Sequence, residues 1–282
     1  RSTTDIEVLL PVVEAFVADN PTISVIYEQW GSNALYRNSL AACRGQLPTS
    51  DAVFSSGVHQ MIDLVNRACA SPYQSDRTTA LPRARRWRDE LWGITKEPAV
   101  IIYNKSLVPQ EDIPLTRFKL LDLMRRPNSI YQGKIATYDI EASGLGYLFA
   151  YMDSQEATTF GALLEGFART DSVATCCSSE IIKGVAEGRY LIAYNVLGSY
   201  VDSISSSKIG IVLPQDYTLF LSRTYLIPKG AEHPAEAALL LEFMLSARGQ
   251  SLLKQSNLVF EDHSDALPLA ESAERAIAIG PS

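Results

Sequence analysis

The sequence contains few of the residues that metal and nucleophilic sites need. Only three histidines and four cysteines occur among 282 residues, and no two cysteines have the C-x-x-C spacing of a zinc or thioredoxin-type site. The patterns G-x-S-x-G, H-E-x-x-H and G-x-x-x-x-G-K-S/T are also absent. We therefore expect no catalytic residue, no metal ion and no cofactor in this protein.

Long apolar runs and an excess of positive charge are missing as well. No stretch reaches the roughly 18 apolar residues that a membrane-spanning helix requires. A net charge of −7 and an isoelectric point near 5.1 argue against a general nucleic-acid binder. With 46% hydrophobic and 20% charged residues, the composition is typical of a folded globular protein with two domains or one large one.

The first part of the chain alternates helical and strand patterns. Thr4 and Glu7 have capping-box spacing ahead of an apolar stripe at helical period, which Asn20 and Pro21 end. A strand is then expected at 23–28, a helix at 33–43, a strand at 51–54 and another helix after 55–57. This order predicts an α/β layer with a largely parallel sheet, which binds ligands at the carboxyl ends of its strands. A strand in front of Arg1 would complete the first unit, so we expect that a segment precedes it.

A second α/β series follows a buried strand expected at 99–104. Further strands are expected at 134–139, 190–195, 209–214 and 224–228, and helices from Ser143, at about 158–167, at 179–186 and at 234–245. We predict an α/β fold with two lobes, lobe 1 from residues 1–102 and 218–282 and lobe 2 from residues 103–217. Extended crossover strands would join the lobes, so a ligand cleft is expected between them.

Six segments of the sequence occur in an order that is known from a protein family. They are RSTTD, DAVFSSGVHQMIDLVN, WGITKEPAVIIYNKSLV, YQGKIATYDIEASGLGYLFA, AEGRYLIAYNVLGSY and PQDYTLFLSRTYLIPKGAEHPAEA. In this order they resemble the type II periplasmic solute-binding proteins of bacterial ABC importers, and within these the ferric-ion and hexose-phosphate-binding branch. The resemblance covers essentially the whole chain. It implies a monomeric bacterial protein, periplasmic or extracytoplasmic, that delivers a small solute to a transporter permease.

The residues that would hold iron in this branch are replaced here. Ferric binders carry adjacent tyrosines where this sequence has Gly198 and Ser199, and an acidic metal ligand where it has Ser56. Ferric ion prefers phenolate and carboxylate oxygens, and hydroxyl groups alone hold it poorly. We therefore reject iron as the solute.

Three predicted helix starts are rich in hydrogen-bond donors and carry no charge. Such starts offer amide groups and a positive dipole end to an anion, and the resemblance implies that the loop at 142–146 lies at the cleft. The candidate ligand-binding residues at these starts are Ser2, Thr3, Thr4, Ser55, Ser56, Ser143, Gly144 and Leu145. Two alternatives stay open, because serine and threonine are favoured N-caps at any helix, and small residues let a helix pack closely on a strand.

Four further residues complete the candidate ligand site. Arg223 follows the second crossover and could pair with a phosphate or carboxylate, or else form a surface salt bridge. Glu97 could accept hydrogen bonds from sugar hydroxyls, or pair with a neighbouring side chain. Asn195 and Ser199 are expected at a strand end that faces the cleft, where amide and hydroxyl groups recognise polar substituents.

The cysteines form two groups. Cys43 and Cys69 each lie near the end of a predicted helix, and the two helices flank the strand at 51–54. We therefore expect a disulfide between them if the protein works in an oxidising compartment. Cys176 and Cys177 are adjacent, and we interpret them as two small, half-buried residues rather than as a redox centre.

These patterns predict the solute-binding component of an ABC transporter, whose lobes close over a small anionic solute. A phosphorylated sugar ranks ahead of a di- or tricarboxylate. Two other functions stay open: the same lobes could form the ligand-sensing domain of a membrane kinase, and some enzymes share the two-lobed architecture. The expected partners are the small anion and a permease or sensor kinase, with no nucleic acid.

Overall fold

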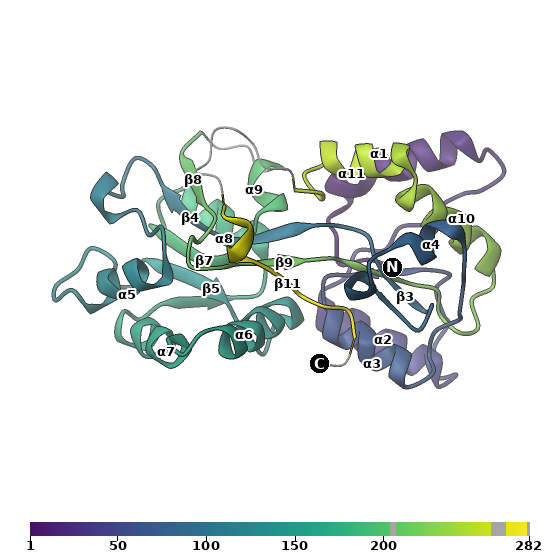
Figure 1. Cartoon of the computed structure of the whole chain (residues 1–282), viewed down its shortest axis with the longest axis horizontal. Helices are drawn as coiled ribbons and strands as arrows, with labels where there is room; N and C mark the ends of the chain where they lie inside the picture. The colour runs from purple at the N-terminus through teal and green to yellow at the C-terminus, as the bar shows by residue number, and fades with distance from the viewer. Residues whose placement is uncertain (204–206, 261–268, 281–282) are drawn as a thin grey trace. The chain divides into compact units, whose positions relative to one another are not determined.

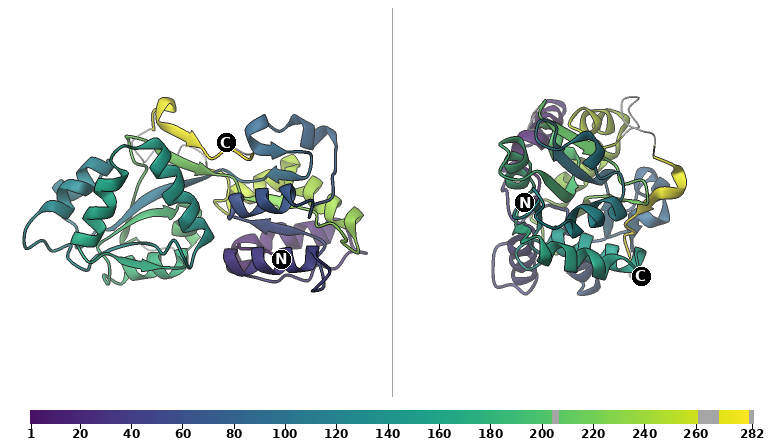
Figure 2. Two further views of the ribbon diagram at one scale, coloured as in Figure 1. Left: turned by 90° about the horizontal axis from the view of Figure 1, so that it is seen from below. Right: turned by 90° about the vertical axis from the view of Figure 1, so that its left-hand side faces the viewer.

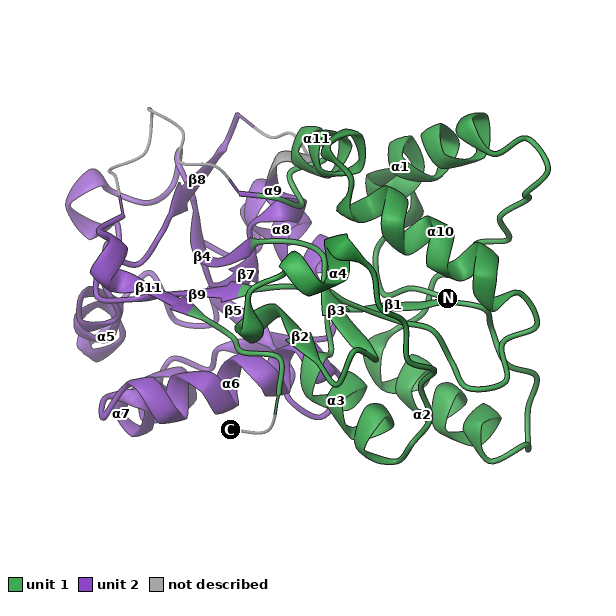
Figure 3. Cartoon of the chain, turned by 45° about the vertical axis from the view of Figure 1, so that its right-hand side comes forward, with its two compact units in different colours: residues 1–96, 221–259, 276–282 green, residues 97–220, 260–275 purple. Residues whose placement is uncertain are grey.

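The chain folds into two compact units, which Figure 3 shows in different colours. The computed structural model describes residues 1–203, 207–260 and 269–280. Unit 1 comprises residues 1–96, 221–259 and 276–282, and unit 2 comprises residues 97–220 and 260–275. Each unit combines helices with a β-sheet, which confirms the predicted two-lobed α/β class. The lobe boundaries expected from the sequence, 1–102 with 218–282 and 103–217, stay a prediction.

Unit 1 contains a four-stranded sheet in which neighbouring strands are antiparallel. Its strands, in spatial order, are β1 (Val53–Ser55), β10 (Thr224–Leu226), β3 (Leu91–Gly93) and β2 (Arg86–Trp87). Tyr225 of β10 lies opposite both Phe54 of β1 and Trp92 of β3. The predicted largely parallel sheet is therefore wrong for this unit, because β10 returns from a distant part of the chain and runs against both neighbours.

Helices surround the sheet of unit 1. They are α1 (Ile6–Asp19), α2 (Ser32–Cys43), α3 (Val58–Asn66), α4 (Asp76–Ala80), α10 (Pro234–Leu245) and α11 (Ala247–Gln255). Helix α3 packs on β3 and β10, and α1 packs on α10 and α11. The basic run at 83–88 forms the short 3₁₀ helix η1 (Arg83–Arg85) and leads into β2.

Helix α1 begins differently from the expected capping box. Its N-cap is Asp5, whose own side chain makes no capping hydrogen bond, and the Ile6 amide donates instead to Gln29 Oε1 at 3.1 Å. The hydroxyl of Thr4 instead accepts a hydrogen bond from the Arg223 guanidinium at 3.0 Å. The predicted capping box of Thr4 and Glu7 is therefore wrong, because a buried arginine occupies the hydroxyl that would have closed it.

The strand expected at 23–28 does not form. These residues have no regular secondary structure, and the nearest pairing is a single parallel bridge between Ser2 and Gln29. On one side they line a cavity of about 540 Å³, which α1, β1 and α10 also border. A β-branched alternating segment becomes a strand only where another strand pairs with it along its length, and here that neighbour is reduced to one bridge.

A disulfide between Cys43 and Cys69 links the end of α2 to the residues that follow α3. The Cα atoms lie 5.3 Å apart, which is within the usual range for this bond. The predicted pairing is thus confirmed in the structure. Closing a loop of this length stabilises a fold by about 3 kcal/mol.

Unit 2 is built on a mixed sheet. Its path runs through β11 (Glu274–Ala276), β9 (Thr218–Leu221), β4 (Glu97–Asn104), β7 (Ile192–Leu197), β5 (Ile135–Tyr138) and β6 (Val173–Thr175), with β8 (Ile209–Val212) paired to β4. Strands β6 and β7 both run parallel to β5, whereas β4 is antiparallel to β7 and β8. The parallel arrangement expected from the sequence is therefore correct for β6, β5 and β7 and wrong for the pairs that β4 forms with β7 and β8.

Helices cover both faces of the sheet of unit 2. They are α5 (Arg117–Arg125), α6 (Gly144–Glu156), α7 (Phe160–Arg169), α8 (Ser178–Ala186) and α9 (Ser199–Ser203), with the short 3₁₀ helices η2 (Gln110–Asp112) and η3 (Glu271–Ala273). Apolar side chains of α5 and α7 form one core with Ile135 and Tyr194 of the sheet. Helix α8 packs on β4, β5 and β7 from the opposite side to α6 and α7 (Figures 1 and 2). In the described parts of the chain, no helix is both long and apolar enough to cross a membrane.

Candidate functional site

The carboxyl ends of three parallel strands meet at one edge of the sheet in unit 2, which we call the carboxyl edge. Strand β5 leads into the start of α6, β6 into Cys176 and α8, and β7 into Ser199. The Tyr138 hydroxyl joins these ends, because it shares a hydrogen bond with Ser178 Oγ at 2.6 Å and accepts one from the Leu197 amide at 3.2 Å. Ligands of open α/β sheets bind outside such edges.

The start of α6 lies at this edge, as expected for Ser143, Gly144 and Leu145, and all three residues are buried. Ser143 is the N-cap, and its hydroxyl accepts a hydrogen bond from the Gly146 amide at 3.0 Å. A Cβ on Gly146 would lie 2.4 Å from the Cβ of Tyr138. The glycine at 146 is therefore explained by close packing of α6 on β5, while anion binding by residues 143–145 stays a prediction.

Two candidate residues from distant parts of unit 2 contact each other. The Ser199 hydroxyl donates a hydrogen bond of 2.5 Å to Glu97 Oε2, and both side chains are buried. Nearby, the Gly198 amide donates to the Pro98 carbonyl at 2.9 Å. The structure thus brings the side chains of Glu97 and Ser199 into contact. Their role in solute binding stays a prediction.

Asn195 does not lie at a strand end. It sits inside β7 with φ of +54°, where the pairing with β4 shifts register between Val100 and Ile102. Asparagine tolerates this left-handed conformation better than most residues. Its amide nitrogen donates to Asp153 Oδ2 at 2.6 Å, and its side chain is buried. The predicted position of Asn195 is wrong because a bulge turns its side chain towards α6.

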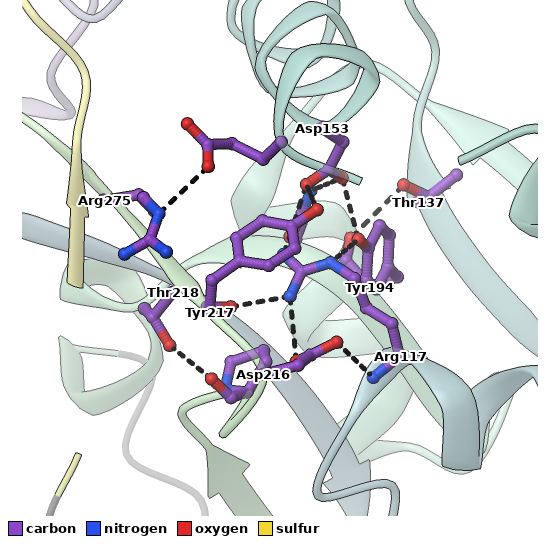
Figure 4. Close-up of polar contacts among 11 residues, drawn as sticks. Arg117, Thr137, Asp153, Tyr194, Asp216, Tyr217, Thr218 and Arg275 are labelled. Carbon is purple, nitrogen blue, oxygen red and sulfur yellow. Dashed lines mark hydrogen bonds and ion pairs between the residues drawn. The ribbon is translucent and has the colours of Figure 1, made fainter. Parts of the chain in front are cut away.

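Asp153 anchors a buried polar network that no sequence pattern indicated (Figure 4). Its carboxylate accepts hydrogen bonds from the hydroxyls of Tyr194 and Tyr217, both at 2.7 Å. The Arg117 guanidinium lies 3.2 Å from the same carboxylate. Burial raises the pKa of both tyrosines above the ordinary value, so they remain hydrogen-bond donors.

Arg117 completes this network and is fully buried. It donates to the Tyr194 hydroxyl and to the Tyr217 carbonyl, each at 2.6 Å, and reaches Asp216 at 3.2 Å. Its guanidinium also lies 3.5 Å from the centre of the Tyr217 ring. The contacts link α5, α6 and β7 inside unit 2, so the network holds these elements together.

In unit 1 the starts of α1 and α3 meet through their hydroxyl groups. Thr3 Oγ1 and Ser56 Oγ are 3.1 Å apart, and the Ser56 amide donates to Thr3 Oγ1 at 2.9 Å. The hydroxyls of Ser2 and Ser55 accept hydrogen bonds from the amides two residues later, at 3.0 and 3.1 Å. The structure therefore gathers these predicted residues, with Thr4, into one group, which we call the hydroxyl cluster.

The backbone amides in the hydroxyl cluster are largely used by the protein itself. The Thr3 amide donates to the Phe54 carbonyl, and the Val58 amide donates to the Ser56 carbonyl, both at 3.0 Å. The expectation that the starts of α1 and α3 present bare amides is therefore wrong. What the cluster offers to a ligand is its hydroxyl groups, each of which can both donate and accept.

Arg223 lies directly beside the hydroxyl cluster. It lies between β9 and β10, and the residue is 1% exposed. The guanidinium donates to Thr4 Oγ1, and the Arg223 amide donates to Thr95 Oγ1 at 2.8 Å. Burial raises the pKa of the nearby Asp5 carboxyl, and the charge of Arg223 opposes that rise. The alternative of a surface salt bridge is wrong because this charge is buried.

Cys176 and Cys177 are joined by a disulfide, with Cα atoms 3.8 Å apart. Both residues are exposed at the carboxyl edge, directly before α8. The expectation that both residues are half-buried is therefore wrong, because both are exposed. Adjacent cysteines in the sequence were the only signal of this bond.

No metal centre is apparent among the residues that the structure describes, since no group of three acidic, histidine or cysteine side chains converges there. Ser56 and Ser199, which stand at two positions of iron ligands in the resembled branch, are hydrogen-bonded to Thr3 and Glu97. Neutral hydroxyl groups suit polar or anionic solutes better than a hard trivalent cation.

Comparison with known proteins places this geometry in a family. The chain is similar to the substrate binding protein of the ABC transporter from Agrobacterium tumefaciens, with 30% identity and a TM-score of 0.91 over 99% of this chain and 86% of that chain. The ferric binding protein from Campylobacter jejuni has 20% identity and a TM-score of 0.74 over 96% and 88% of the two chains. AfuA from Actinobacillus pleuropneumoniae, solved with exogenous fructose-6-phosphate bound, has 14% identity and a TM-score of 0.74 over 96% and 90%.

The last two likenesses show the fold alone. No curated protein sequence matches the chain. A family model described as bacterial extracellular solute-binding protein matches residues 2–251. The chain therefore belongs to the family of bacterial extracellular solute-binding proteins.

Proposed function

We propose that this protein is the extracytoplasmic solute-binding component of an ABC importer, located in the periplasm of a bacterium. Membership of the solute-binding family supports this role, and so does the likeness to the substrate binding protein of an ABC transporter. The family consists of binding proteins rather than enzymes. The permease of the importer is the proposed macromolecular partner, and the protein acts as a monomer.

The proposed solute is a small anion. The observation that carries this proposal is the position of Arg223, a buried positive charge beside the hydroxyl cluster. A buried charge attracts an anion more strongly than an exposed one, because little water screens it. Since the residue is 1% exposed, we propose that Arg223 acts on the solute through its field and through Thr4, which it holds in place.

Within the anions, a phosphorylated sugar ranks ahead of a di- or tricarboxylate. The hydroxyls of Thr3 and Ser56 use one hydrogen in the bond between them, so the other hydrogen can be donated to a phosphate oxygen or to a sugar hydroxyl. We also propose that the protein is more closely related to the hexose-phosphate binders than to the ferric binders. Closure of the two lobes over the solute is the proposed signal that the permease reads.

A thermal-shift panel tests this function. Purified protein is heated with fructose 6-phosphate, citrate, inorganic phosphate, ferric citrate, fructose and arginine in separate samples. We expect at least one anion to raise the unfolding midpoint, because a ligand that binds only the folded state stabilises it. Stabilisation by ferric citrate but by no iron-free anion, or by fructose or arginine without any anion, would contradict the proposal. A coupled assay for turnover of the bound solute tests the alternative of an enzyme.

A further inference from the structure

The disulfide between Cys176 and Cys177 has no part in the function proposed above. It closes the smallest loop that two cysteines can form, and loop-closure stabilisation grows with loop length. It therefore constrains the unfolded chain less than the Cys43–Cys69 bond does, which spans 26 residues. What the bond does fix is the local backbone at the end of β6.

Hydrogen bonds connect this backbone to the start of α6, where residues 143–145 are predicted to bind the anion. Thr175, the last residue of β6, lies in register with Tyr138 of β5. The Thr175 carbonyl accepts from the Asp139 amide at 2.9 Å, and the Asp139 carbonyl accepts from the Ser143 amide at 2.9 Å. Two hydrogen bonds thus connect the residue before the disulfide to the start of α6.

A second connection runs through Ser178, the residue after the disulfide. Its hydroxyl forms a hydrogen bond with the Tyr138 hydroxyl, which also accepts a hydrogen bond from the Leu197 amide. The disulfide is consequently held between fixed neighbours on both sides. It is exposed, although most cysteines in proteins are buried.

The chemistry of the exposed bridge differs from that of its neighbours. A disulfide has no hydrogen to donate, and its sulfur atoms are polarizable and apolar in character. Ser178 follows the bridge directly and carries a hydroxyl group, and Ser143 carries another at the start of α6, which two hydrogen bonds connect to Thr175. A solute with a hydrocarbon face and a polar substituent would match the apolar sulfur atoms and the serine hydroxyl groups, respectively.

We propose that the Cys176–Cys177 disulfide is a solute-contacting element of unit 2, against which the hydrocarbon face of the solute packs beside the start of α6. The inference rests on the proposed solute-binding function but not on the charge of the solute. Reduction to two thiols would release the backbone at 175–178 from the constraint of the bond. It would also remove the apolar surface of the two bonded sulfur atoms. The affinity for the solute would therefore fall.

The first arm of the test compares two double variants. The solute from the panel that stabilises the wild type is titrated by calorimetry into C176S/C177S and into the control C43S/C69S. We expect C176S/C177S to unfold near the wild-type midpoint and to bind at least about fivefold more weakly, which corresponds to about 1 kcal/mol. The control should show the reverse, a lower midpoint with unchanged affinity below that midpoint.

The second arm measures protection of the bond in the wild type. A water-soluble phosphine reduces the disulfide to two thiols and is itself oxidised to the phosphine oxide with oxygen from water. N-ethylmaleimide then labels the thiols, and peptide mass spectrometry reports the rate at each cysteine. Saturating solute should slow labelling of Cys176 and Cys177 and leave Cys43 and Cys69 unchanged.

Both arms must agree for the inference to stand. An affinity of C176S/C177S within about twofold of the wild type, or labelling that the solute does not slow, would overturn it. Failure of the anion proposal is a separate outcome: the wild type would then bind fructose or arginine and no anion, and both arms would be run with that solute.

Discussion

At the scale of single residues, the buried charges of unit 2 give the clearest energetic consequence. Asp153 and Arg117 are 1% and 0% exposed on their side chains and lie 3.2 Å apart. Removing one partner of a buried ion pair leaves the other charge uncompensated, which is far costlier than losing an exposed charge.

We expect Asp153→Ala to lower the free energy of unfolding by about 3–5 kcal/mol. Urea denaturation of the variant and the wild type measures the loss. Asp122 on α5 is exposed and serves as a matched control, and Asp122→Ala should change stability by less than about 0.5 kcal/mol. Equal effects of the two substitutions would contradict a structural role for the network.

Arg223 carries the proposed charge recognition. Arg223→Ala should weaken binding of the anion by at least about tenfold, which corresponds to about 1.4 kcal/mol, because it removes both the buried charge and the hydrogen bond that holds Thr4 in place. Arg223→Lys keeps the charge and should retain more affinity than Arg223→Ala, which separates charge from packing. Arg37 on α2 is exposed, and Arg37→Ala is the control. Calorimetric titration that shows equal affinity for all these proteins would remove Arg223 from the site.

His59 on α3 should make stability depend on pH. Burial lowers the pKa of its imidazole from an ordinary value of 6.5 to about 4. Between these values the unfolded chain binds a proton that the folded protein rejects, so stability is lost as pH falls through this window. At about pH 5 we expect a loss of about 2 kcal/mol relative to neutral pH.

The contribution of His59 is isolated with His59→Gln, which cannot titrate. Chemical denaturation of both proteins across the window removes the effect of the carboxylates, since these are common to both. The two stability curves should diverge as pH falls from 6.5 to about 4. Parallel curves would show that His59 titrates normally in the folded protein.

At the scale of elements, periodicity located most helices because each packs one face on its own unit. Helix α10 has the predicted bounds, Pro234–Leu245. The prediction of a strand at 23–28 was wrong for a different reason. A strand forms only where another strand pairs with it, and the local sequence pattern does not show which segments pair. Strand β6 spans three residues, which is too short for an alternating pattern to be recognised.

Two helix glycines should respond in opposite ways to substitution by alanine, because one lies against a neighbouring strand and the other does not. Gly146→Ala would place a Cβ 2.4 Å from that of Tyr138, so α6 must shift and stability should fall by about 1–3 kcal/mol. At Gly161 on α7, a methyl group would meet no atom within 4 Å. Gly161→Ala should therefore stabilise the protein by up to about 1 kcal/mol. Thermal unfolding compares them, and a stable Gly146→Ala protein would show that close packing does not require this glycine.

At the scale of the whole molecule, the family and the α/β class could be predicted from the order of segments, but the polar groupings could be predicted only in part. Helix starts rich in serine and threonine pointed to Thr3 and Ser56, which the structure brings within 3.1 Å. The pairing of Asp153 with Arg117, 36 residues apart, has no local signature. Such contacts follow from how helices pack, which a single sequence does not display.

The central claim is that this protein captures a small anion. Native mass spectrometry of protein purified from a bacterial periplasm, without refolding, tests it most directly, because a retained solute adds its mass to the folded chain. We expect a one-to-one complex with a sugar phosphate or an organic acid that dissociates on unfolding and is depleted in Arg223→Ala. A bound ferric ion, or a neutral or cationic solute retained equally by the wild type and Arg223→Ala, would contradict the account.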